Sequence, residues 1–186
     1  MIITRKGEEL EVPGQQPAVG EKAASFSLKD LQDRTYNLED FDNGKPTILS
    51  VVPDINTRVC ALQTKRFNQE ASQLEDVNFA TISNNTKEDQ AKWCGQEGVD
   101  MIMLHDPENT FGKTYNLYIP EADKFTRSIF VLDQNGTITY EEFVPEMSDE
   151  PDYQKALKEA KTLLSVKFIE VSSRRIKKKP LLYSLG

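Results

Sequence analysis

A short apolar run between two prolines is the feature that most restricts how this chain can fold. Residues 47–53, TILSVVP, form a continuous hydrophobic and β-branched stretch that Pro46 precedes and Pro53 ends. A strand that is buried on both faces of a mostly parallel sheet has this composition, whereas a strand with one solvated face alternates apolar and polar residues. The run therefore predicts the central strand of an α/β domain.

The residues after this strand predict a helix that carries a cysteine in its first turn. Apolar side chains recur at helical spacing across 57–74. Cys60 falls where unpaired backbone N–H groups and the helix dipole favour a thiolate over a thiol. Arg58, and Arg127 from elsewhere in the chain, can add positive charge, and Thr57 supplies a hydroxyl. A buried structural cysteine is an equally good interpretation at this point, because free cysteines are common in protein cores.

The rest of the chain alternates between predicted strands and helices. Thr86 and Asp89 have the spacing of a capping box, and Asn135-Gly136 is typical of a tight hairpin turn. An N-terminal hairpin is expected at 4–12, strands at 25–30, 34–41, 77–83 and 101–106, a second hairpin at 127–144, and helices at 86–98, 107–117 and 151–164. This order predicts an α/β domain in which helices cover both faces of a mixed sheet.

Composition and charge exclude several classes of function. The chain has 186 residues, a formal net charge of -7 and no segment of the roughly 20 apolar residues that a membrane span requires. An acidic protein is a poor general ligand for nucleic acid or anionic membrane, which recruit Lys and Arg. The N-terminus lacks the apolar core of a signal peptide. We therefore expect one cytoplasmic domain without nucleic-acid or membrane partners.

The two cysteines are too few for a stabilising disulfide framework. His105 is the only histidine and, with two distant cysteines, matches no zinc-ligand spacing, so we expect no metal and treat His105 as structural. Cys94, beside Trp93 on the next predicted helix, can be a core residue. It can also resolve the sulfenic acid that forms when Cys60 attacks an O–O bond, by condensing with it to a disulfide.

Residues 53–71, PDINTRVCALQTKRFNQEA, resemble the active-site signature of thiol peroxidases of the Tpx type, the atypical two-cysteine peroxiredoxins. The segments KWCGQEGVD at 92–100 and RSIFVLDQNGTITYEEFV at 127–144 match the same family. The likeness extends from about residue 2 to about residue 165. It implies a thioredoxin-like fold over 1–165, with a central mixed β-sheet flanked by helices and an N-terminal β-hairpin.

The resemblance also implies a role for each matched site residue. Cys60 is the peroxidatic nucleophile and Cys94 the resolving thiol of the same chain. Thr57 hydrogen-bonds the thiolate and the peroxide oxygen, Arg127 stabilises the thiolate and holds the peroxide, and Pro53 shields the pocket from water. Because the two cysteines lie on separate helices, closing the disulfide should require local unwinding of both regions.

Reduction of hydrogen peroxide and organic hydroperoxides, with thioredoxin or a similar dithiol as reductant, follows from the same resemblance. It implies a homodimer and no cofactor. A redox sensor or binding module that uses the two thiols as a switch is the alternative. A thioredoxin-like disulfide oxidoreductase would need a Cys-x-x-Cys pair, and 57–60 reads TRVC instead.

Two regions depart from the family pattern. The loop before Cys60 carries Asp54, Asn56 and Arg58 where the family has Pro-Ser-x-Asp-Thr followed by a small residue or proline. Residues 166–186 form a basic C-terminal extension, which we interpret as flexible and solvated. The alternatives are that its basic run binds nucleic acid, acidic lipid or an acidic partner, or that its FIEV segment adds an edge strand.

Overall fold

The computed structural model describes residues 1–71, 73–98 and 101–177. Its centre is a mixed sheet of seven strands in the order β11-β10-β5-β6-β7-β3-β4, in which β5, β6 and β7 are parallel and the other pairs antiparallel. The sheet strands are β3 (Ser27–Lys29), β4 (Thr35–Asn37), β5 (Thr47–Val51), β6 (Asn78–Ser83), β7 (Ile102–His105), β10 (Ser128–Leu132) and β11 (Ile138–Phe143). The predicted mixed sheet is therefore confirmed.

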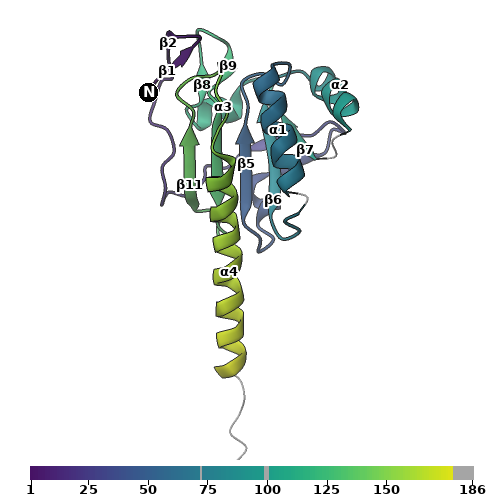
Figure 1. Cartoon of the computed structure of the whole chain (residues 1–186), viewed down its shortest axis with the longest axis vertical. Coiled ribbons are helices and arrows are strands. Elements are labelled where there is room, and N and C mark those ends of the chain that lie inside the picture. The colour runs from purple at the N-terminus through teal and green to yellow at the C-terminus, as the bar shows by residue number, and fades with distance from the viewer. Residues whose placement is uncertain (72, 99–100, 178–186) are drawn as a thin grey trace, which may run out of the picture.

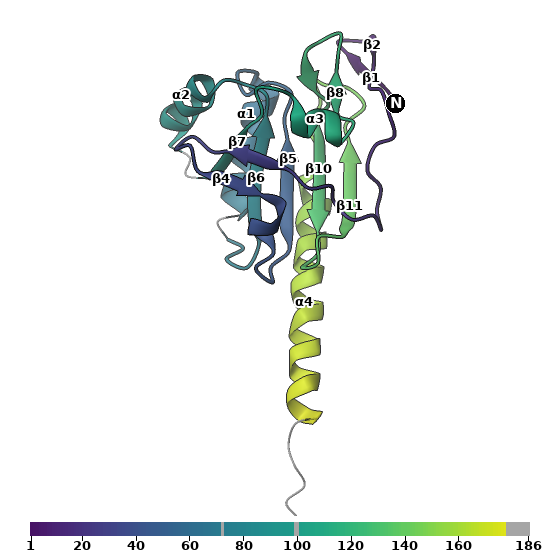
Figure 2. The same ribbon diagram turned by 180° about the vertical axis from the view of Figure 1, so that it is seen from behind.

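Helices cover both faces of the sheet, and two small hairpins lie outside it (Figure 1, Figure 2). The helices are α1 (Arg58–Ala71), α2 (Lys87–Glu97), α3 (Thr110–Thr114), α4 (Tyr153–Lys177) and the 3-10 turn η1 (Leu38–Phe41). The hairpins are β1 (Ile2–Arg5) with β2 (Glu8–Glu11), as predicted, and β8 (Tyr118–Ile119) with β9 (Lys124–Phe125).

Strand β5 occupies the interior of the sheet, and all five of its residues are buried. Ile48 points to the face that α1 and α4 cover, where it packs in one cluster with Phe67. Leu49 points to the opposite face and packs with Phe111 of α3. Both faces of the strand are thus apolar because helices cover the sheet on both sides, as the continuous apolar run predicted.

The structure corrects several details of the predicted elements. Helix α4 begins at Tyr153, so Pro151 precedes the helix instead of lying in its first turn, and the helix continues past Leu164 to Lys177. The FIEV segment is helical, not an edge strand. The β8–β9 hairpin was missed because two-residue strands carry too little pattern to recognise. The tail beyond Lys177 lies outside the described residues, and the boundary at residue 165 stays a prediction.

Across the described ranges, the structure contains no helix with the length and apolarity that a bilayer crossing demands.

Two helical glycines differ sharply in the space around them, which gives a test of the packing. A Cβ added to Gly112 would lie 2.2 Å from Phe125 Cε1, whereas one added to Gly95 would meet no atom within 4 Å. We expect Gly112→Ala to lower the free energy of unfolding by about 1–3 kcal/mol. Gly95→Ala should raise it by about 0.5–1 kcal/mol, since alanine is the better helix former. Urea unfolding of the reduced proteins measures both, and effects of the same sign would contradict this packing.

Candidate active site

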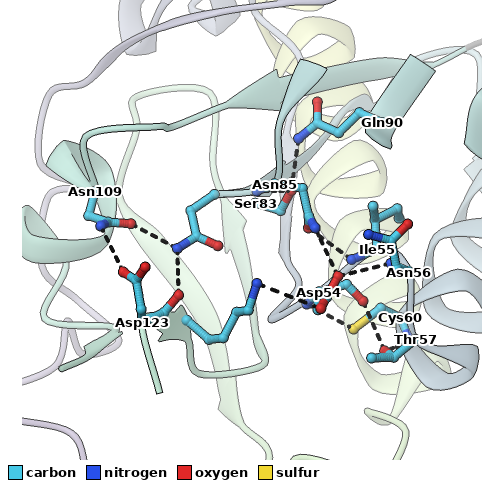
Figure 3. A network of polar contacts seen from close by, with 12 residues as sticks. Asp54, Ile55, Asn56, Thr57, Cys60, Ser83, Asn85, Gln90, Asn109 and Asp123 are labelled. Carbon is cyan, nitrogen blue, oxygen red and sulfur yellow. Dashed lines mark hydrogen bonds and ion pairs between the residues drawn. The ribbon is translucent and has the colours of Figure 1, made fainter. Parts of the chain in front are cut away.

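Cys60 lies in the first turn of α1, immediately after the loop that follows β5. Its side chain is completely buried. The backbone N–H of Asp54 donates to Cys60 Sγ across 3.4 Å, and the N–H of Cys60 itself donates to Thr57 Oγ1, also across 3.4 Å (Figure 3). The loop therefore folds back on the helix start, so that a peptide dipole points at the sulfur. A backbone donor in this position stabilises negative charge on the sulfur.

The Thr57 hydroxyl closes the loop on itself. It donates to the backbone oxygen of Asp54 across 2.9 Å while accepting from the N–H of Cys60. The predicted contact between this hydroxyl and the thiolate is not among the hydrogen bonds of the described residues. The donor that the sulfur uses is instead the N–H of Asp54, a contact that side-chain patterns cannot reveal.

The carboxylate of Asp54 fixes the loop to the end of the neighbouring strand β6. Asn85 Nδ2 donates to Asp54 Oδ1 across 2.8 Å, and Asn85 Oδ1 accepts from the N–H of Ile55 across 2.9 Å (Figure 3). Lys124 Nζ adds an ion pair at 3.6 Å. Burial works against ionisation of Asp54, but Asn85, the N–H of Asn56 and Lys124 outweigh it and lower its pKa. Asp54 is therefore a fixed negative charge that holds the loop.

His105 contacts the backbone of Asn85, the residue that holds the Asp54 loop. Its Nδ1 lies 2.6 Å from the backbone oxygen of Asn85, at the end of β7. This contact agrees with the structural role expected for His105.

Arg127 lies just before β10 with its guanidinium buried, and side-chain and backbone oxygens hold it there. Nη1 donates to Gln63 Oε1 and Nη2 to the backbone oxygen of Met147, each across 2.7 Å. Gln63 is itself fixed by a 2.8 Å hydrogen bond from Nε2 to Ser50 Oγ on β5. Arg127 Nε is buried without a hydrogen-bond partner in the described part of the chain. The Nε–H donor of the guanidinium is thus left for another acceptor.

A pocket of about 270 Å³ connects these groups. Pro53, Thr57 and Arg127 all line it, so the structure brings three of the predicted site residues together. Val59 and Met147 add apolar walls. Cys60 lies behind the lining, in contact with the loop that forms one side of it.

Cys94 lies on α2, beside α1 in both ribbon views (Figure 1, Figure 2). It is half-buried and does not line the pocket above Cys60. The two cysteines are not joined by a disulfide, and both belong to one apolar cluster that includes Trp93 and Met103. Helix α2 has the predicted Thr86 cap and ends at Gly98 in a left-handed conformation. The two cysteines therefore share one packed cluster without being bonded to each other.

The N-terminal hairpin is attached to the edge of the pocket by the Glu146 carboxylate and by backbone hydrogen bonds of Thr4 with Pro145 and Met147. Glu146 accepts from Thr4 Oγ1 at 2.7 Å and from the N–H groups of Lys6, Gly7 and Ser148 at 3.0, 3.2 and 3.0 Å. The Thr4 hydroxyl and these N–H groups lower the pKa of Glu146 to about 2. This contact joins segments that are 142 residues apart.

Comparison with known proteins identifies the family. The pattern of the AhpC/TSA family matches residues 19–141, about two thirds of the chain. The chain belongs to the AhpC/TSA family. A thiol peroxidase of Bacillus subtilis is 42% identical over 164 residues, covering 87% of this chain and 98% of that protein. A thiol peroxidase of Streptococcus pneumoniae is 41% identical and covers 87% and 100%.

Solved structures of the AhpC/TSA type share the fold. A peroxiredoxin-like protein from Aquifex aeolicus superposes with a TM-score of 0.81 at 22% identity, covering 87% of this chain and 96% of that one. A thiol peroxidase from Chromobacterium violaceum gives 0.76 at 19% identity, covering 89% and 96%. The predicted thioredoxin-like fold is confirmed. The relatives also confirm the predicted thiol-dependent peroxidase activity, and they do not favour the redox-sensor alternative.

Gln63 should position Arg127 without touching the substrate. Gln63→Met removes the acceptor of Arg127 Nη1, so we expect the rate at which peroxide consumes the Cys60 thiol to fall about ten- to hundredfold, as small misplacements of catalytic groups do. Ser50→Ala is the matched control, because it removes the other partner of Gln63 but keeps the Gln63–Arg127 bond. If both variants lost stability and rate in parallel, the role of Gln63 would be structural only.

Glu146 should make the docking of the hairpin depend on pH. Its folded-state pKa is lowered to about 2, below the usual value of about 4.3. Its ionised form therefore stabilises the fold above the usual pKa, and that stabilisation is lost as the pH falls through the folded value. We expect wild type to exceed Glu146→Gln in free energy of unfolding near neutral pH, and the gap to shrink from about pH 4.3 towards about pH 2. A gap independent of pH would contradict this.

Proposed function

We propose that Cys60 is the peroxidatic nucleophile of this chain and that hydrogen peroxide and organic hydroperoxides are its substrates. The observation that carries the proposal is the pairing of two features beside one pocket. The sulfur of Cys60 accepts a hydrogen bond from the N–H of Asp54, and the buried Nε of Arg127 has no partner among the described residues. A sulfur that receives a backbone N–H and a cationic donor that has no partner in the described chain suit attack on an O–O bond.

The reaction needs only the thiol and the peroxide. The thiolate attacks the terminal oxygen of the hydroperoxide, and the S–O bond forms as the O–O bond breaks. Hydroxide or alkoxide leaves and takes a proton from solvent to become water or an alcohol, and Cys60 becomes a sulfenic acid. Negative charge moves from sulfur to the leaving oxygen, and the guanidinium of Arg127 is held where it can stabilise that charge. Thr57 and Pro53 line the approach and limit the water that enters.

Cys94 completes the proposed cycle as the resolving thiol. Its sulfur attacks the Cys60 sulfenic acid, water leaves, and an intramolecular disulfide forms. Both residues belong to the same apolar cluster, which shortens the path between the sulfurs once the start of α1 and the end of α2 unwind. Gly95 and Gly98 lower the cost of unwinding α2 there.

The family assignment supports thiol-type reductants and oligomers in general, and the finer assignments are proposals. We propose thioredoxin or a similar dithiol as the electron donor, a homodimer as the working form and the cytoplasm as the compartment. An external dithiol reduces the Cys60–Cys94 disulfide by exchange through a mixed disulfide.

A peroxide-consumption assay with a thioredoxin system on wild type, Cys60→Ser and Cys94→Ser tests these roles. We expect Cys60→Ser to be inactive, because the nucleophile is gone. Cys94→Ser should still form a sulfenic acid in a single turnover but turn over poorly with thioredoxin, because no disulfide is available for exchange.

Mass spectrometry of the oxidised wild type should show the Cys60–Cys94 disulfide within one chain. Amide exchange around both cysteines should be faster in the oxidised form if the start of α1 and the end of α2 unwind. Full peroxidase activity in Cys60→Ser would refute the mechanism, and full thioredoxin-linked turnover in Cys94→Ser would remove Cys94 from it.

A further inference from the structure

Positive charge is concentrated around the pocket above Cys60. Arg5, Lys6, Arg58, Lys124 and Arg127 all line this one cavity of about 270 Å³. They come from the β1–β2 hairpin, the start of α1, β9 and the residue before β10. The chain as a whole has a formal net charge of -7, so five cations at one pocket run against its overall composition.

Much of this charge is not neutralised by carboxylates. Asp54 is the one acidic residue in the lining, and its carboxylate is engaged by Asn85 and Lys124. Within the described ranges, no carboxylate lies within 4.0 Å of the side-chain nitrogens of Arg5, Lys6 or Arg58. Three exposed cations therefore face the pocket mouth without a protein counter-ion.

Two of these cations occupy positions that are locally unfavourable for the stability of the fold, which suggests that their charge serves a function. Arg58 is the first residue of α1, where the positive end of the helix dipole disfavours a cation. Lys6 adopts a left-handed backbone conformation with φ of 54°, which is uncommon for a residue other than glycine. The carboxylate of Glu146 binds the backbone of the hairpin, and so holds Arg5 and Lys6 at the pocket without forming an ion pair with either.

We propose that this pocket selects hydroperoxides that carry a carboxylate, so that the anionic end of the substrate meets Arg5, Lys6 and Arg58 while the peroxide reaches Cys60. The proposal rests on the peroxidase function above and adds the substrate class. Val59 and Met147 contact the carbon chain between the two ends. The pocket is smaller than the roughly 300–1,000 Å³ of typical small-molecule sites, which favours a short chain.

The chemistry is unchanged by the carboxylate. The Cys60 thiolate takes the terminal oxygen, the O–O bond breaks, and the product is a hydroxy acid that keeps its carboxylate. The cations act on binding and orientation, and their attraction for an anion should weaken as salt screens them.

The test compares two hydroperoxides that share one carbon skeleton and differ in whether its acid group is a charged carboxylate or a neutral methyl ester. One is a tert-alkyl hydroperoxide with a carboxylate on one methyl group, and the other is its methyl ester. The second-order rate constant for oxidation of reduced full-length protein is measured by stopped flow without any reductant, with the fluorescence of Trp93 as the signal. Trp93 is the single tryptophan and packs in the cluster that contains Cys60. Loss of titratable thiol provides an independent readout.

We expect wild type to react about tenfold faster with the carboxylate than with the ester at low salt, because exposed charge pairs each contribute about two- to fivefold. Arg5→Gln and Arg58→Gln should each lower this ratio by about two- to fivefold, and the double variant should bring it close to one. Lys161→Gln, an exposed cation on α4 away from the pocket, is the matched charge control and should leave the ratio unchanged.

Three results would overturn the proposal. Equal rate constants for the acid and the ester in wild type would show that the cations do not recognise the substrate carboxylate. The Cys60-dependent activity would be unaffected by that result. A ratio that Arg5→Gln and Arg58→Gln leave intact, with a raised KM for an acidic thioredoxin, would assign the cations to the reductant. No oxidation of Cys60 by either compound would instead refute the peroxidase function itself.

Discussion

The hydrogen bond from the backbone of Asp54 to the sulfur of Cys60 is the contact on which the rest of the site depends. It exists because β5 ends at Val51, just before Pro53, and the chain must turn before α1 begins at Arg58. Strand β5 is paired on both sides, so the point at which the loop leaves the sheet is fixed. Asn85, which follows the neighbouring strand β6, then clamps the loop through two hydrogen bonds. The position of the sulfur is thus set by the two most deeply buried parallel strands of the sheet.

Burying Arg127 at the edge of the pocket is energetically costly, and the structure shows how the cost is limited. Unpaired ions are strongly disfavoured in an apolar interior. Gln63 and the backbone of Met147 each accept one hydrogen bond from the guanidinium, so the ion is solvated by neutral dipoles and not by a carboxylate. A neutral acceptor leaves the positive charge uncancelled. The guanidinium can therefore stabilise negative charge that develops in the pocket, because no internal ion pair neutralises it.

Much of this architecture could be predicted from the sequence, because it rests on local patterns. The buried strand, the helix with Cys60 in its first turn, the Thr86 cap and the Asn135-Gly136 hairpin each follow from short-range spacing. The interactions that complete the site join residues far apart in the chain. Gln63 reads as a polar position on a helix, and only the fold brings it to Arg127. The extension of α4 was also missed, because the polar and basic sequence after Leu164 lacks the apolar periodicity by which a packed helix is recognised.

One departure from the family loop, Asp54, has a physical explanation in the fold. Asp54 would repel a thiolate if its carboxylate faced the sulfur, but the carboxylate is turned towards Asn85 and Lys124 while its backbone N–H faces Cys60. Asp54 thus directs the positive end of its backbone N–H dipole at the sulfur and its negative carboxylate away from it. The sequence shows the acid and not its orientation, which is why its effect on the thiol could not be predicted.

The anchoring of the N-terminal hairpin by Glu146 has a consequence for the order in which the protein is assembled during synthesis. Two cations of the pocket mouth, Arg5 and Lys6, emerge from the ribosome first, yet the carboxylate that holds them in place belongs to residue 146. Cys60 and the whole of α1 are exposed long before that contact can form. The Cys60 thiol is therefore synthesised early and enclosed late. For an interval during synthesis the nascent chain contains the nucleophile but not yet the hairpin contact that completes the pocket.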